Sequence, residues 1–139
     1  MNLTYQLLDH TADLRVRITG AGRTELFRNA GLALADLICH PDSLTADETL
    51  TVDIEGADPA DLMVNFLREL LYLWTGKEKL VNMLSILNVS DTALSARIAV
   101  SHYDARRHTI LNEIKAVTYH QIAVEPTANG WQATVVFDI

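Results

Sequence analysis

The feature that most constrains the fold is a change in hydrophobic period along the chain, from every second residue to a helical spacing and back again. Residues 58–77, DPADLMVNFLRELLYLWTGK, carry apolar side chains three and four positions apart over most of their length. Asp58 is expected to cap this helix, and Pro59 suits its first turn. The same spacing predicts another helix from Thr24, as its cap, to about Cys39. Apolar stripes this broad are typical of helices that face a core.

Segments of alternating or continuous apolar residues surround these helices. The predicted strands are residues 2–8, 14–18, 49–56, 83–90, 92–103, 112–126 and 131–139. Before the last of them, the dipeptide NG at 129–130 favours a tight hairpin turn. This order of elements predicts an α+β fold, in which two helices pack on a mixed, largely antiparallel β-sheet. Residues 1–139 are expected to form a single compact domain, because no repeat or linker-like segment divides them.

Charge and composition exclude several classes of protein. The chain has a formal net charge of -7, which disfavours strong direct binding of nucleic acid, since that binding relies on lysine and arginine to neutralise phosphate. The first residues lack the basic head and apolar run of a secretory signal, and no window approaches the ~20 apolar residues of a membrane span. We therefore expect a cytoplasmic protein without a membrane partner. Cys39 is the only cysteine and is expected to be buried.

Acidic residues gather at two places far apart in the sequence. Asp13 closes the segment DHTAD at the start of one predicted strand, and Asp138 lies in VVFDI, one residue before Ile139. If these strands are neighbours, the two side chains and the α-carboxylate of Ile139 converge, and like charges this close are costly unless a cation or protons neutralise them. Oxygen ligands of this kind suit calcium or magnesium. Spacing alone leaves a plainer interpretation open, in which the acids only cap turns or lie in solvent.

The five histidines and Lys115 are further candidates for functional residues. No serine or cysteine stands in a nucleophile-elbow or oxyanion context, so a histidine-dependent hydrolase has little support and structural roles are expected for the histidines. No phosphate-binding loop is present in the sequence. Lys115, in EIKAVTYH, either shields a sheet edge or marks a binding face.

Three segments together resemble the archease family. They are DHTAD at 9–13, IKAVTYH at 114–120 and the ending VVFDI at 135–139, with helices in the positions where that family has its own. The likeness covers essentially the whole chain, and the order and spacing of the three segments make it specific. In one place the chain departs from the family: YDARRHTILNE precedes IKAVTYH, so no interface residue is carried over from this stretch.

The resemblance implies a protein cofactor and not an enzyme, so that no residue is expected to be catalytic. Archeases assist RNA ligases of the RtcB type in tRNA splicing and RNA repair, promoting guanylylation of the ligase and its multiple turnover. The family's divalent-metal ligands correspond to Asp13, Asp138 and the main-chain oxygens of Ile139. The ion is usually described as calcium, and magnesium is the alternative for this chain. His10, Lys115 and His120 are candidate contacts to the partner or to the metal ligands.

Two other classes of function stay open at this point. The first is a metal-dependent enzyme that acts on a phosphorylated small molecule or RNA end, with His10 or His120 as the base. The second is a structural interaction module, in which Asp13 has no functional role. For the archease-like role, an alternative is that the ion serves only to fasten the last strand to the DHTAD turn.

Overall fold

The computed structural model describes residues 5–9 and 13–139, and the described part contains two α-helices, one short 3-10 helix and seven β-strands. The helices are α1 (Arg23–Ile38), η1 (Pro41–Ser43) and α2 (Pro59–Thr75). The strands are β1 (Tyr5–Asp9), β2 (Asp13–Gly20), β3 (Glu48–Glu55), β4 (Lys79–Val89), β5 (Ala93–His102), β6 (Ala116–Thr127) and β7 (Gly130–Asp138).

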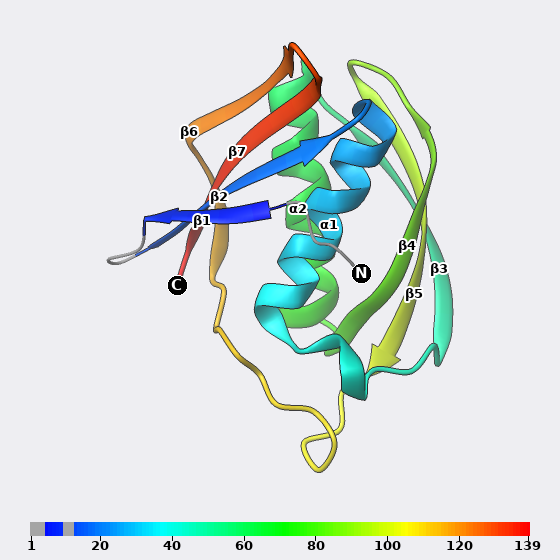
Figure 1. Ribbon diagram of the computed structural model, residues 1–139. Helices are drawn as coiled ribbons and strands as arrows, with labels where there is room; N and C mark the ends of the chain where they lie inside the picture. Colours follow the sequence, from blue (N-terminus) through cyan, green and yellow to red (C-terminus); the bar gives the residue numbers. More distant parts are fainter. Residues whose placement is uncertain (1–4, 10–12) are drawn as a thin grey trace.

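The strands form two separate antiparallel sheets with the helices between them (Figure 1). One sheet has the order β1-β2-β7-β6 and the other the order β3-β5-β4. Both α1 and α2 contact strands of both sheets. The predicted α+β class and its two helices are therefore confirmed, while the strands divide into two sheets instead of one, and every pairing is antiparallel.

The core explains why the apolar stripes of the helices are so broad. A helix that lies between two sheets must present apolar side chains to each of them, so more of its circumference is buried than in a helix on one sheet. In α1, Phe27 packs against Phe66 of α2 with 6.0 Å between the ring centroids. Close to this contact, a Cβ added at Gly31 would lie 2.6 Å from Cδ2 of Leu84, so a larger residue would force that side chain to shift.

Strand alternation follows the sequence pattern and fixes which residues face outward. Leu14, Val16 and Ile18 of β2 are buried, as are Ala96, Ile98 and Val100 of β5. In β3, the apolar residues are half-buried and the intervening residues are exposed. Each sheet therefore keeps one face on the helices, and within residues 5–9 and 13–139 no further layer covers its other face, as antiparallel sheets allow.

The ends of several elements differ from those predicted. Helix α1 begins one residue before Thr24, with Gly22 as its N-cap and no side-chain capping bond. Asp58 does cap α2, accepting a hydrogen bond from the Asp61 N–H at 2.8 Å. The β6–β7 hairpin is confirmed, but Thr127 pairs with Gly130, so that Asn129 ends the turn and Gly130 starts β7.

The segment between β5 and β6 is irregular over most of its length. Residues 103–115 cross from one sheet to the other beneath the ends of both helices (Figure 1). The predicted strand 112–126 therefore begins only at Ala116. Within the described residues, no helix is both long enough and apolar enough to cross a membrane.

Candidate functional site

The pairing of β2 with β7 brings Asp13 and Asp138 together. These two residues are direct cross-strand partners, although they are separated by almost the whole sequence. Their neighbours Leu14 and Phe137 are buried, so alternation places both aspartates on the outer face of the sheet. Directly opposed residues have Cβ atoms about 4.5–5.5 Å apart, which puts two negative side chains side by side.

Asp138 is held from both sides by main-chain pairing. It pairs with Asp13 on β2 and with Ala116 on β6, and its carbonyl oxygen accepts a hydrogen bond from the Lys115 N–H at 2.8 Å. Ile139 follows directly and is 39% exposed. The backbone of the sheet therefore fixes the position of Asp138, and its side chain stays open to solvent.

The donor set around this pair suits a hard cation in its chemistry. Both side chains offer carboxylate oxygens, which calcium and magnesium prefer, and the one cysteine of the sequence, Cys39, is buried at the end of α1. Over residues 5–9 and 13–139 there is no group of three or more histidine, cysteine, aspartate or glutamate side chains arranged to hold a metal. A cation held by Asp13 and Asp138 would thus need main-chain and water oxygens to complete its shell.

The remaining predicted site residues lie at different distances from this pair. Lys115 is exposed and adjoins it through the main chain. His120 is exposed within β6, and its main-chain N–H donates to the Thr118 hydroxyl at 3.2 Å. His10 lies outside the described residues.

A bulge in β6 displays the segment around His120. Thr118 pairs with Val136 and Ala123 with Thr134, so β6 has several more residues than β7 across this interval. Gln121 adopts a left-handed conformation with φ of 56° inside the bulge. The alternation expected for a regular strand is therefore lost here, which the sequence did not predict.

Tyr119 fastens the bulge to helix α2. Its hydroxyl donates to Oδ1 of Asp61 at 2.6 Å, and the guanidinium of Arg68 lies 4.7 Å from the centre of its ring. The hydrogen bond from Tyr119 is the main cause that lowers the pKa of the Asp61 carboxyl, and the same bond raises the pKa of Tyr119. Sequence reasoning missed this cluster because its members are 58 positions apart and carry no joint pattern.

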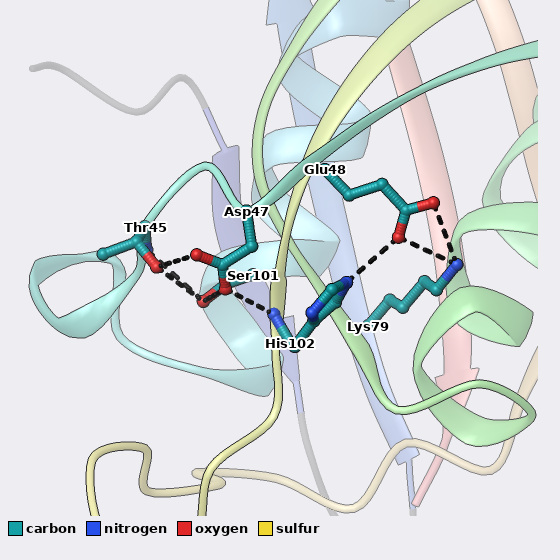
Figure 2. A network of polar contacts seen from close by, with 6 residues as sticks. All are labelled: Thr45, Asp47, Glu48, Lys79, Ser101 and His102. Atoms are coloured by element: carbon teal, nitrogen blue, oxygen red, sulfur yellow. Dashed lines mark hydrogen bonds and ion pairs between the residues drawn. The ribbon is translucent and has the colours of Figure 1, made fainter.

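A further polar network joins the ends of the three strands of the other sheet (Figure 2). The Glu48 carboxylate accepts from the Lys79 ammonium and pairs with Nε2 of His102, each at 3.0 Å. These two partners lower the pKa of the Glu48 carboxyl. Asp47 accepts from the main-chain N–H of His102 at 2.9 Å, which is the main cause of its lowered pKa. The network ties β3, β4 and β5 together and has the character of a structural brace.

His108 and Cys39 are both buried, as a structural role requires. His108 is buried, its Nδ1 accepts from the Asp104 N–H at 2.9 Å, and its Nε2 lies 3.2 Å from the Ser43 carbonyl oxygen. The structural role expected for this histidine is confirmed. Cys39 is buried as predicted, and burial raises the pKa of its thiol.

Comparison with known proteins gives matches over the whole chain. A family model described as "Archease protein family (MTH1598/TM1083)" matches residues 5–139. Protein archease of Methanosarcina barkeri is 34% identical over 139 residues, which cover 97% of this chain and 95% of that protein. Protein archease of Thermoplasma volcanium is 34% identical over 137 residues, covering 99% of this chain and 100% of that protein.

More distant matches extend to an animal protein and a solved structure. The archease-like protein of Drosophila melanogaster is 28% identical over 142 residues, covering 99% of this chain and 91% of that protein. The solution structure of Methanobacterium thermoautotrophicum protein 1598 superposes with a TM-score of 0.81. At 24% identity it covers 99% of this chain and 100% of that one, and it supports the fold described above.

Proposed function

Because this chain belongs to the archease family, we propose that it is a protein cofactor of an RNA ligase of the RtcB type. In this role it promotes guanylylation of the ligase and allows it to turn over repeatedly during tRNA splicing or RNA repair. The observation that carries the proposal is the direct pairing of Asp13 with Asp138, which brings two of the acids expected in the family onto one face of the sheet.

A divalent cation belongs to the proposal. Asp13 and Asp138 would hold it through their carboxylates and Ile139 through main-chain oxygens, with calcium as the preferred ion and magnesium as the alternative. Once bound, the ion would supply positive charge at the surface that approaches the ligase. The contribution of this chain is to fix the two aspartates on adjacent strands, so that the ligands are positioned before the ion arrives.

The charge of the chain supports a protein partner. An RNA ligase must hold a phosphate backbone, which requires basic residues near its active site. A chain with a net charge of -7 is attracted to such a surface and repelled by RNA itself. The expected binding is therefore to the ligase, without strong direct contact to nucleic acid.

The cysteine and one of the histidines fit a role as a cofactor better than a role in catalysis. Cys39 is buried with a raised pKa, which makes it a poor nucleophile. His108 is buried with both ring nitrogens near main-chain partners, which leaves neither nitrogen open to a substrate. These features argue against a nucleophilic enzyme that uses either residue.

Multiple-turnover ligation tests the proposal. The RNA ligase of the same organism is supplied with GTP and a pair of RNA ends, with and without this protein, and product per ligase is counted over time. We expect wild type to raise the number of turnovers and Asp13→Asn to lose the effect. Glu125→Gln, which removes an exposed carboxylate from the far end of the same sheet, should behave as wild type.

Two results would contradict the proposal. Unchanged turnover with wild type would refute the role as a cofactor. Hydrolysis of cyclic-phosphate or phosphomonoester substrates by this protein alone, lost in Asp13→Asn, would favour the metal-dependent enzyme instead.

A further inference from the structure

An open groove lies between the C-terminal end of α2 and the irregular segment that leads into β6. Its volume is about 770 Å³, and its walls include Trp74 and Glu78 on one side and Ile110, Leu111 and Glu113 on the other. It lies where residues 103–115 pass beneath the helix ends (Figure 1). A groove of this size can accept several side chains of another protein.

The apolar part of the groove is held in place by the backbone. Leu111 is 51% exposed, although its N–H donates to the Ile38 carbonyl at 2.8 Å. The next residue, Asn112, donates from its side chain to the Leu37 carbonyl at 2.7 Å. These bonds fix the segment against the end of α1 and present Leu111 outward. A fixed apolar side chain loses little conformational entropy when a partner covers it.

Aromatic and strained residues line the opposite wall. The Trp74 ring meets Tyr103 edge-on, with 5.1 Å between the ring centroids, and is itself half-buried. Glu78 adopts φ of 54°, a left-handed conformation that is unfavourable for a residue other than glycine. Its N–H donates to the Trp74 carbonyl at 2.9 Å and its carbonyl accepts from the Tyr103 N–H at 3.0 Å. These bonds hold the Glu78 backbone in that conformation at the groove wall.

The charges of the groove favour a basic partner. Glu78 and Glu113 contribute two exposed carboxylates, against the single ammonium of Lys115. The Lys115 N–H also bonds to the Asp138 carbonyl at 2.8 Å, so one end of the groove adjoins the aspartate pair. A partner that engages the aspartates and extends past this end of β7 would meet the groove as well.

We propose that this groove docks a segment of the RNA ligase in which a bulky apolar side chain stands next to a lysine or arginine. The inference rests on the proposed function, which supplies the basic partner. The apolar side chain would pack against Trp74 and Leu111, and the basic group would pair with Glu113. Buried aromatic and apolar anchors of this kind supply most of the affinity in protein interfaces.

Binding to the ligase tests the groove. The ligase is titrated by calorimetry with wild type, with Leu111→Arg and with Glu113→Lys. The control is Leu87→Arg, which changes an equally exposed leucine on β4, roughly 26 Å along the strand from its start. We expect Leu111→Arg and Glu113→Lys each to weaken binding about tenfold or more, and Leu87→Arg to bind within about twofold of wild type.

The outcomes separate this inference from the proposed function. Wild type that activates the ligase, together with groove variants that bind as tightly as wild type, would overturn the groove alone. Wild type that neither binds nor activates the ligase would overturn both. Concentration-dependent self-association that Leu111→Arg abolishes, with ligase binding unchanged, would assign the groove to a second copy of this chain. Unfolding in urea verifies that each variant is folded, and Glu113→Lys keeps the test decisive if Leu111→Arg is unstable.

Discussion

Replacing Asp13 by asparagine should change stability in opposite directions with and without a divalent cation. Without one, the substitution removes the repulsion between Asp13 and Asp138, which are direct cross-strand partners. At a separation of about 6 Å, two unit charges repel by roughly 0.7 kcal/mol in water and about 2.8 kcal/mol at an effective dielectric constant of 20. Asp138 is exposed, so screening favours the lower value. In a chelator, Asp13→Asn should therefore stabilise the protein by about 0.2–1 kcal/mol.

With a saturating cation, wild type should instead be more stable than Asp13→Asn. A ligand present at about 100 times its dissociation constant stabilises the folded state by about 2.7 kcal/mol. For a chain of this length, 1 kcal/mol corresponds to roughly 3 °C, so calcium should raise the Tm of wild type by roughly 8 °C. Asp13→Asn lacks one of the carboxylates, so calcium should raise its Tm much less.

Thermal unfolding followed by circular dichroism, in chelator and in millimolar calcium chloride, measures both effects. Glu125→Gln is the matched control, because it removes an exposed carboxylate of the same sheet but leaves the aspartate pair intact. It should respond to calcium as wild type does. If the Tm of wild type is the same in chelator, calcium and magnesium, the reasoning from paired carboxylates to a cation is refuted.

Three further predictions concern stability. Gly130→Ala should destabilise by about 2 kcal/mol in urea unfolding, because Gly130 has φ of 150° and a Cβ there would lie 2.4 Å from the Gly20 carbonyl oxygen. Asp58→Ala should cost about 1 kcal/mol in the same assay, through loss of the N-cap of α2. The free energy of unfolding should fall as the pH drops below about 4.5, the ordinary pKa of glutamate, because His102 and Lys79 lower the pKa of Glu48 in the folded state. Glu48→Gln should show a smaller fall over the same pH range.

Each of these has a control in the chain. Gly22→Ala adds a Cβ that meets nothing within 4 Å, so a loss equal to that of Gly130→Ala would contradict the steric argument. Thr24→Ala removes a hydroxyl with no capping role and should change stability by less than about 0.5 kcal/mol. Glu125→Gln should leave the pH dependence as in wild type, and a Glu48→Gln profile that matches wild type would exclude the proposed role of that carboxylate.

Local patterns predicted the elements well because their causes are local. The periodicity of residues 59–75 and the capping by Asp58 come from neighbours within a few positions, and the structure has the helix where it was expected. The hairpin before β7 was likewise predicted from one dipeptide. Its exact turn differs because Gly130 is needed where β7 passes close to Gly20, a contact between distant segments.

The division into two sheets depended on information that local patterns lack. The alternation of apolar residues indicates which face of a strand is buried, but not which strands pair with it. Strands β3, β4 and β5 would show the same alternation in the first sheet as in a second one. Helices buried on two sides were the available signal, since three consecutive residues of α2, Leu62, Met63 and Val64, are all buried and so span about 200° of its circumference.

The candidate site could be predicted only in part, because some of its contacts join segments that are distant in the sequence. Asp13 and Asp138 attracted attention through charge, and the resemblance to archeases placed them together, as the strand pairing does. No charge pattern or family motif in the sequence indicates the Tyr119–Asp61 contact or the groove at Leu111. Each arises only when α2, the β6 bulge and residues 103–115 are assembled in three dimensions.

The most direct test of the central claim is the amount of GMP bound covalently to the RNA ligase. Ligase is incubated with labelled GTP alone, with wild type and with Asp13→Asn, and the labelled ligase is separated on a denaturing gel. The account predicts faster and more complete labelling with wild type, and labelling at the level of ligase alone with the folded Asp13→Asn variant. Labelling that does not change when wild type is added would contradict the account.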